Sequence, residues 1–199
     1  YGISKDEYGV NLEENIRALV AKMKSMDYYP APVREVKIPK GDGKFRPLGI
    51  SNVEDKIVQM MFAKILTAIY EPMFAPESFG FRPGRSCHDA IKNLHSHLSK
   101  KNYGVVIDVD LSNFFGSINH RKLIQILEMK IKDKVFIRYI VRMLKAGILS
   151  DGELTMSEDG TPQGSIVSPI LANVFAHYAI DRFIKQNARE LSSDHIHMV

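Results

Sequence analysis

Apolar positions along the chain recur at two spacings, which predict a mixture of amphipathic helices and short strands. Spacings of three and four residues predict helices over residues 11–26, 52–71, 86–98, 119–130 and 134–146, and a long helix that follows the turn at 160–165 and runs through 184. Alternating or continuous apolar runs predict strands over 33–39, 45–50, 105–111 and within 147–157. Good capping residues stand at several expected helix starts: Asn11, Asn52, and Ser86 with Asp89 as a capping box.

Turn residues join two pairs of the expected strands into hairpins. Gly41-Asp42-Gly43 separates the first pair, and Asp151-Gly152 forms the turn of the second. Pro47 has no amide donor, so its strand should lie at the edge of a sheet. The cations Lys37, Lys40, Lys44 and Arg46 lie along the first hairpin. Such a hairpin is either a solvated edge protected against aggregation or a surface for anions.

The apolar run from Val105 to Leu111 is interrupted only by Asp108 and Asp110. Alternate residues of a strand point to the same face, so both carboxylates would share one face of the predicted strand. Two like charges on a half-buried strand repel each other, and a divalent cation held by oxygen ligands removes this repulsion. The alternative is that Asp108 only begins a solvated face or caps a turn.

Composition limits the classes of protein to which this chain can belong. The 199-residue chain carries a net charge of +4, which permits a polyanionic partner without requiring one. The single Cys87 excludes an internal disulfide and a cysteine-based zinc site. The sequence has neither a membrane-spanning apolar run nor a signal-peptide pattern. Because the chain opens at Tyr1 and stops at Val199 in a strand-like run, we expect a fragment of a longer protein.

Four separated segments form the most specific pattern in the chain. They are Ile38-Pro39-Lys40 through Arg46-Pro47-Leu48-Gly49-Ile50; Gly80-Phe81-Arg82-Pro83-Gly84-Arg85-Ser86; Asp108-Val109-Asp110 through Phe115 and His120; and Gly160-Thr161-Pro162-Gln163-Gly164 followed by Ser168-Pro169-Ile170-Leu171-Ala172-Asn173. In this order and spacing they resemble the fingers and palm of reverse transcriptases encoded by group II introns, also called maturases. The resemblance covers residues 10–199.

The resemblance implies an α/β (α+β) fingers–palm fold, with fingers over residues 1–104 and a partial palm over 105–199. It further implies an antiparallel palm sheet backed by helices, in which 105–111 is the central strand and 195–199 begin the next one. The fragment would stop before the family's Tyr-x-Asp-Asp strand.

The function implied is RNA-directed DNA synthesis, together with binding of group II intron RNA to assist splicing and mobility. The cofactor would be Mg²⁺, as two ions in the complete site. Expected partners are the intron RNA, an RNA template with a DNA primer, and deoxynucleoside triphosphates, without a membrane; a homodimer stays open. The expected location is the bacterial cytoplasm, with an organellar host as the alternative.

Site residues follow from the resemblance position by position. Asp110 would be the catalytic aspartate and would bind the metal ions together with the carbonyl of Leu111. Lys40 and Arg46 would grip the triphosphate, and Phe115 would discriminate against a 2′-hydroxyl. The remaining expected contacts are Gln163 and Gly164 at the nascent base pair, and Arg82 and Arg85 near the template.

Three features depart from this picture. Gly116 stands where the family commonly has an acidic residue, which changes the electrostatics of the site. The second catalytic aspartate would come after Val199, so we expect residues 1–199 to be inactive alone. Finally, a two-residue turn at Asp42-Gly43 would pair Lys40 with Phe45 and Pro39 with Arg46, which would put Lys40 and Arg46 on opposite faces.

Two other functions compete with this interpretation. A phosphatase of the haloacid dehalogenase type would use Asp108 as nucleophile, but it needs a parallel sheet wound with alternating helices, which the expected element order fits poorly. A maturase that binds and stabilises intron RNA, with vestigial polymerase activity, is the second. Loss of DNA synthesis with retained RNA affinity in Asp110→Ala would separate binding from polymerisation.

Overall fold

The computed structural model describes residues 2–199 except 42, 101–104, 157, 162–163 and 192–195. Its strands are β1 (Val33–Gly41), β2 (Lys44–Ile50), β3 (Ile148–Ser150) and β4 (Glu153–Thr155). Its helices are α1 (Lys5–Val10), α2 (Leu12–Lys24), α3 (Val53–Tyr70), η1 (Glu71–Met73), α4 (Cys87–Leu98), α5 (Phe114–Ser117), α6 (His120–Lys130), α7 (Lys134–Leu144), α8 (Ser168–Ala176), η2 (His177–Asp181) and α9 (Arg182–Leu191). The predicted mixed α/β class is confirmed.

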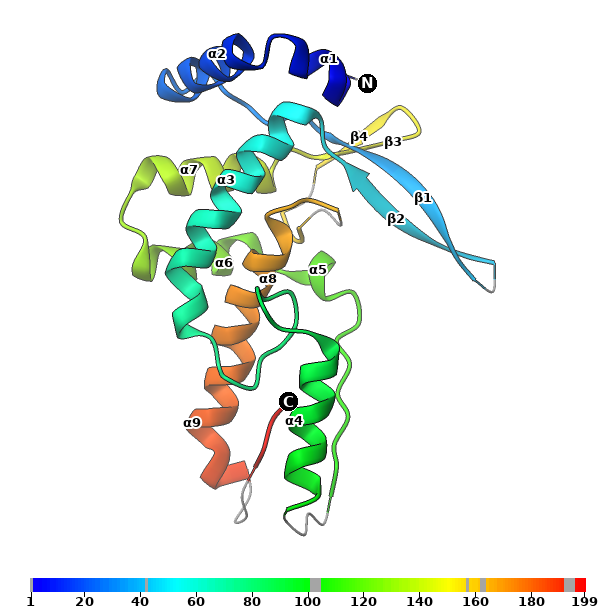
Figure 1. Cartoon of the computed structure of the whole chain (residues 1–199), viewed down its shortest axis with the longest axis vertical. Helices are drawn as coiled ribbons and strands as arrows, with labels where there is room; N and C mark the ends of the chain where they lie inside the picture. Colours follow the sequence, from blue (N-terminus) through cyan, green and yellow to red (C-terminus); the bar gives the residue numbers. More distant parts are fainter. Residues whose placement is uncertain (1, 42, 101–104, 157, 162–163, 192–195) are drawn as a thin grey trace.

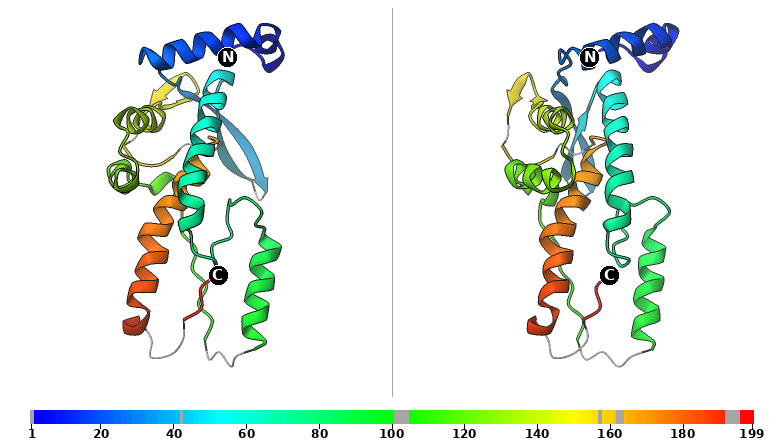
Figure 2. Two further views of the ribbon diagram at one scale, coloured as in Figure 1. Left: turned by 60° about the vertical axis from the view of Figure 1, so that its left-hand side comes forward. Right: turned by 90° about the vertical axis from the view of Figure 1, so that its left-hand side faces the viewer.

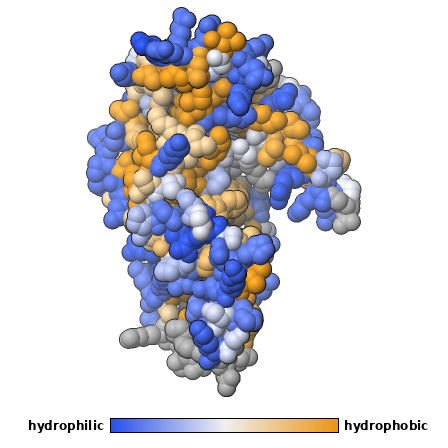
Figure 3. Space-filling view, in the orientation of Figure 1, coloured by the Kyte–Doolittle hydropathy of each residue, from blue (hydrophilic) through white to orange (hydrophobic). Residues whose placement is uncertain are grey.

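The molecule is elongated, with its sheet towards one end (Figure 1). Helices α1 and α2 lie across that end, and α3 runs lengthwise beside α8. Helices α6 and α7 flank this centre on the side opposite the projecting β1–β2 hairpin, and α4 and α9 extend to the far end (Figures 1 and 2). On the face seen in Figure 3, hydrophobic residues gather mainly over the upper half, around α2, α3 and the sheet.

Two of the three predicted capping residues cap their helices through the side chain, whereas Asn11 stands at the start of α2 without a side-chain capping hydrogen bond. Asn52 Oδ1 accepts a hydrogen bond from the amide of Asp55 at 2.7 Å, and Ser86 and Asp89 form the reciprocal capping box that starts α4. Two features were not predicted. Helix α1 is too short to show a period, and the long helix expected through residue 184 contains the π-helical segment η2 between α8 and α9.

The sheet has the strand order β2-β1-β3-β4. Both predicted hairpins form, and β2 lies at the edge of the sheet, as Pro47 predicted. The β1–β3 pairing is parallel, with Val33 opposite Ile148, and no sequence pattern indicated it. This short mixed sheet is not the parallel sheet wound with helices that the phosphatase alternative requires.

The predicted central strand over residues 105–111 was wrong. This segment is irregular and pairs with no strand of the described residues, and Val105, Ile107 and Val109 are 76%, 80% and 73% exposed. A strand forms only where neighbouring backbone supplies hydrogen-bond partners. Residues 196–199 do not supply them, because they lie beside α4, where His197 Nε2 is 2.9 Å from Asn93 Oδ1. An antiparallel palm sheet centred on residues 105–111 is therefore not assembled among the described residues.

The hydrophobic core lies where α3, α6, α7 and α8 meet. Leu66 and Tyr70 of α3 are fully buried, as are Leu123 of α6 and Leu171 of α8. The rings of Phe62 and Phe136 stack with centroids 4.4 Å apart, which joins α3 to α7. Each such buried side chain stabilises the fold by about 1.5–3 kcal/mol, so this core holds rigid the elements from which the site loops emerge. None of the described helices combines the length and apolarity needed to cross a membrane.

A buried carboxyl fixes the connection between α2 and β1. Asp55 accepts hydrogen bonds from the Tyr28 hydroxyl at 2.5 Å and from the amide of Ala31 at 3.1 Å. Burial raises the pKa of Asp55 above its usual value of 3.8, although these two hydrogen bonds oppose the rise. The folded state therefore releases this proton at a higher pH than the unfolded chain does.

We expect the folded chain to lose stability relative to Asp55→Asn as the pH rises from about 4 through the raised pKa. The unfolded state is then already ionised, so each unit of pKa elevation costs the wild type about 1.4 kcal/mol. Urea unfolding between pH 3.5 and 7 measures the difference, with the exposed Asp27→Asn as control. If the difference in the free energy of unfolding between the wild type and Asp55→Asn does not change with pH, the expectation is contradicted.

Candidate active site

Two segments forty residues apart run side by side at the centre of the molecule. The amide of Thr161 donates to the carbonyl of Phe115, and the amide of Gly160 donates to that of Ile118, both at 2.7 Å. His120 Nε2 lies 2.5 Å from the carbonyl oxygen of Gly160, so this ring nitrogen carries the proton. These bonds hold the predicted aromatic gate beside the Gly-Thr-Pro-Gln-Gly turn.

Two glycines meet at this contact, and a side chain at Gly160 would clash with the backbone of Gly116. Gly160 has a φ of +86°, and a Cβ there would lie 2.9 Å from the Cα of Gly116. A Cβ at Gly116 would in turn lie 2.5 Å from Oδ1 of Asn113. Gly116, which departs from the family pattern, therefore accommodates the tight turn at the start of α5.

Phe115 is half-buried and belongs to a small aromatic cluster. Its ring meets Phe81 edge-on at 5.9 Å and Phe114 at 6.0 Å. Phe81 is 69% exposed and has a positive φ of 54°, and the side-chain amide of Asn173 donates to the carbonyl of Gly80 at 2.8 Å. The loop before α4 is thereby fixed to α8 with Phe81 against the gate. Phe81 and Asn173 lie in the quoted motifs, but no role could be predicted for them from the sequence, because their contacts are tertiary.

Asp110 lies five residues before Phe115 in the irregular segment, and its side chain is exposed. Asp108 and Leu111 are exposed as well. The carboxylate is thus accessible to a metal ion from solvent, and Asp110 with the Leu111 carbonyl offers the hard oxygen donors that Mg²⁺ prefers. No group of three or more His, Cys, Asp and Glu residues that could hold a metal occurs among the described residues.

The β1–β2 hairpin carries Lys40 and Arg46, and both are exposed. The observed pairing sets Ile38 opposite Arg46 and Pro39 opposite Phe45, with a register shift between Pro39 and Gly41. The pairing expected from a two-residue turn was therefore wrong, because Lys40 is an extra residue in a β-bulge. A bulge interrupts the alternation of side chains between the two faces of a strand. The argument that Lys40 and Arg46 lie on opposite faces, and so cannot share a phosphate, therefore no longer holds. Asp42 lies outside the described residues.

The turn before α8 packs against the edge strand of the hairpin. Gly164 has a φ of +100°, and a Cβ there would lie 2.5 Å from the carbonyl oxygen of Gly49 and 2.9 Å from Cδ1 of Leu48. The amide of Ile166 donates to Oε1 of Gln59 on α3 at 3.0 Å. Gly164 is thus held next to β2 as a backbone contact. Gln163, expected at the nascent base pair, lies outside the described residues.

The two arginines expected near the template differ in their surroundings. Arg82 is only 8% exposed, and its guanidinium group binds both carboxylate oxygens of Glu71 and the carbonyls of Ala75, Ser78 and Glu71. All five of its N–H groups are used, so Arg82 organises the loop, and a template contact would break this network. Arg85 is half-buried, and its Nη1 donates to the carbonyls of Pro76 and Ser78.

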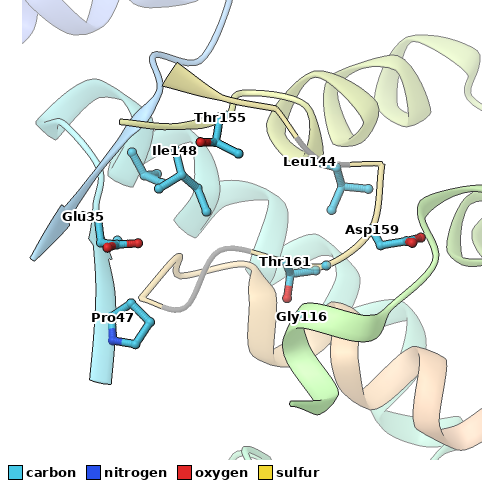
Figure 4. A pocket seen from close by; sticks show the side chains of 12 residues that line it. Glu35, Pro47, Gly116, Leu144, Ile148, Thr155, Asp159 and Thr161 are labelled. Carbon is cyan, nitrogen blue, oxygen red and sulfur yellow. The ribbon is translucent and has the colours of Figure 1, made fainter. Parts of the chain in front are cut away.

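A pocket of about 260 Å³ lies between the hairpin, β3–β4, α5 and residues 159–161 (Figure 4). Glu35 and Asp159 are its ionisable lining residues, and most of the other lining side chains are apolar. Its lining comes from several distant segments, so no local motif could predict it. Neither Asp110 nor Phe115 lines it. The pocket adjoins the expected nucleotide site without being that site.

Comparison with known proteins identifies relatives of the chain in sequence and in fold. The reverse transcriptase (RNA-dependent DNA polymerase) family matches residues 38–199. Among solved structures, the partial Cas6-RT-Cas1–Cas2 complex aligns with a TM-score of 0.56 at 21% identity, over 92% of this chain and 30% of that one. At this identity the structural match supports the fold alone.

Curated relatives match almost the whole chain. The group II intron-encoded protein LtrA of Lactococcus lactis subsp. cremoris is 40% identical over 93% of this chain, and a 91 kDa protein in the cob intron of Schizosaccharomyces pombe is 40% identical over the same share. Protein YkfC of Escherichia coli is 34% identical over 95%. The chain spans 31%, 23% and 51% of these three relatives, respectively. The chain belongs to the reverse transcriptase (RNA-dependent DNA polymerase) family, and group II intron-encoded proteins are among its relatives.

Proposed function

We propose that the complete protein is an RNA-directed DNA polymerase that extends a DNA primer on an RNA template. It also binds group II intron RNA to assist splicing and mobility. The observation that carries the proposal is the pair of 2.7 Å backbone hydrogen bonds between residues 115–118 and 160–161. They support the proposal because they join Phe115, the proposed steric gate, to the segment that leads into the turn proposed at the base pair. Primer extension on an RNA template, with Asp110→Ala as the inactivating variant, is the test.

Each side chain has a distinct part in the proposed reaction. Mg²⁺ ions bound by the Asp110 carboxylate and the Leu111 carbonyl would supply charge stabilisation of the attacking and leaving oxygens. Lys40 and Arg46 bind the triphosphate, and Arg85, whose Nη1 alone is committed to the Pro76 and Ser78 carbonyls, lies towards the template.

The turn beyond Thr161, with Gln163 and Gly164, lines the nascent base pair. Gly164 fits a backbone role there because its Cα approaches β2 too closely for a side chain. In this proposal the fingers comprise residues 1–104 and the partial palm comprises 105–199.

Phe115 tests the substrate preference of the proposed site. We expect Phe115→Val to raise incorporation of ribonucleotides relative to deoxynucleotides by about tenfold to a hundredfold, because a smaller side chain admits the 2′-hydroxyl. Single-nucleotide primer extension with the two triphosphates measures the ratio. Phe114→Val, one residue earlier in the same aromatic cluster, is the matched control and should leave the ratio unchanged. Equal ratios for wild type and Phe115→Val would contradict the proposed gate.

An RNA-binding maturase with vestigial polymerase activity is the second candidate. The relatives encoded within introns favour an RNA-binding role, and the exposed cationic hairpin is compatible with it. RNA binding without any primer extension by the wild-type complete protein would favour this candidate. We propose that either function is carried out in the cytoplasm of a bacterial host, without attachment to a membrane. A homodimer of the parent is compatible with either function.

A further inference from the structure

The positive charge of the chain is concentrated in one segment, residues 120–145. Eight of the 27 Lys and Arg residues lie there, but only two of the 23 Asp and Glu residues. This segment therefore carries +6, while the remainder of the chain carries −2. The net charge of +4 is accounted for by α6, α7 and their connection.

Seven of these cations are exposed, and we call them together the α6–α7 basic surface. Its members are Arg121, Lys122, Lys130, Lys132, Lys134, Arg138 and Lys145. Within the described residues none of them forms an ion pair, whereas Arg17, Lys22, Lys37 and Lys185 elsewhere on the surface are each paired with an acid. Unpaired cations gathered on one surface repel one another, and a polyanion removes this repulsion.

The spacing along α7 aligns part of this surface into a row. Lys134, Arg138 and Lys145 follow one another at i, i+4 and i+11, which places them on one helical face over about 16 Å. The opposite face, with Ile140 and Met143, is buried in the core. The row is therefore held on a rigid helix, and a nucleic-acid backbone presents several phosphates over this length.

The net charge of +6 already includes the two acids of the segment, Asp133 and Glu128. Asp133 Oδ1 accepts from the amides of Val135 and Phe136 at 2.8 and 3.0 Å, so it is committed to the start of α7. Arg142, next to the row, is committed as well, because its guanidinium group donates to the carbonyls of Met26 and Tyr28. Glu128 is the other acid of the segment, and the Lys132 ammonium donates to its backbone carbonyl.

The α6–α7 basic surface lies on the side of the molecule away from the β1–β2 hairpin (Figures 1 and 2). It is therefore a different surface from the hairpin that carries the proposed triphosphate contacts. Met129 and Val135 are the large apolar side chains exposed among these cations. A surface dominated by charge of one sign suits a phosphodiester backbone better than a folded protein partner.

We propose that the α6–α7 basic surface binds the phosphodiester backbone of folded RNA, as a second nucleic-acid surface separate from the polymerase groove. The choice of RNA rests on the proposed function. Bound RNA would contact Lys134, Arg138 and Lys145 through its phosphates, with little dependence on sequence. This surface would orient a structured RNA on the enzyme while the groove handles template and primer.

The test compares two triple variants of the complete protein that lose the same charge. Lys134→Gln, Arg138→Gln and Lys145→Gln remove the α7 row, and Lys56→Gln, Lys64→Gln and Lys92→Gln remove three exposed lysines of α3 and α4. Affinity for a folded group II intron RNA is measured as a function of salt. We expect the α7 variant to weaken binding about tenfold and to lower the slope of log K against log salt by about two to three.

The outcomes separate this inference from the proposed function. Primer extension by the α7 variant on a short homopolymer template should equal that of the wild type, since the groove is untouched. An unchanged salt slope, or an equal loss in the control variant, would overturn the inference. Selective loss of binding to an acidic polypeptide, with RNA affinity intact, would also overturn it. Failure of the wild type itself to extend a primer would reject the proposed function and leave the RNA-binding result standing.

Discussion

Replacing Asp110 with Ala in the complete protein is expected to reduce RNA-templated DNA synthesis by about a thousandfold or more. The proposed mechanism relies on metal ions for charge stabilisation, and Asp110 is the carboxylate on this chain expected to bind them. The side chain is exposed and makes no contact that supports the fold, so the variant should unfold at the same denaturant concentration. Its affinity for intron RNA should stay within about twofold of the wild type, because binding depends on cations elsewhere.

Asp108→Asn is the matched control for this experiment, because it removes the same charge two residues earlier. We expect it to retain most of the activity, since Asp108 is not assigned to the metal site. The same assay on residues 1–199 alone should give no extension, because one aspartate cannot complete a two-metal site. Primer extension by Asp110→Ala, or by residues 1–199 alone, would refute the assignment of Asp110 as a metal ligand of a two-metal site. An equal loss of activity in Asp108→Asn would show that the effect comes from the local charge and not from a metal contact.

Replacing Arg82 with Ala is expected to destabilise the chain by about 3 kcal/mol. The change would leave Glu71 and the carbonyls of Ala75 and Ser78 without their shared donor, and breaking a paired buried charge on one side costs about 3–5 kcal/mol. The lower end applies because Glu71 is partly exposed. The guanidinium group also lies 5.3 Å from the centre of the Phe74 ring, so packing is lost with the charge.

Arg82→Lys provides the comparison, because lysine keeps the charge but cannot reproduce the planar donor geometry. Arg82→Lys should recover part of the stability that Arg82→Ala loses. It should recover a smaller part of the order of the loop at residues 75–86. Urea unfolding of residues 1–199 measures the first, and hydrogen exchange of residues 75–86 measures the second. A template-binding residue would behave differently: Arg82→Ala would then lower RNA affinity without changing the unfolding midpoint.

Local chemistry in the sequence was sufficient for most of the helices and both hairpins. Asn52, and Ser86 with Asp89, mark helix starts through bonds to amides three residues away, and Asp151-Gly152 forms a turn from its own dihedral preferences. Pro47 predicted an edge strand for the same reason, since the missing amide is a property of the residue itself.

Features that depend on distant partners could not be predicted in this way. The run at 105–111 has the composition of a strand, yet it stays irregular because no strand lies beside it. The bulge at Lys40 also escaped prediction, because register depends on how the whole hairpin pairs.

The sequence by itself determined the family, the positions of Asp110 and Phe115, and the concentration of charge in residues 120–145. Only the tertiary structure decided that Arg82 is committed to Glu71, that Gly160 packs against Gly116, and that the charged segment faces away from the hairpin. The physical reason is range: capping, turns and spacing act within a few residues, whereas burial and packing depend on segments that meet only when the chain folds.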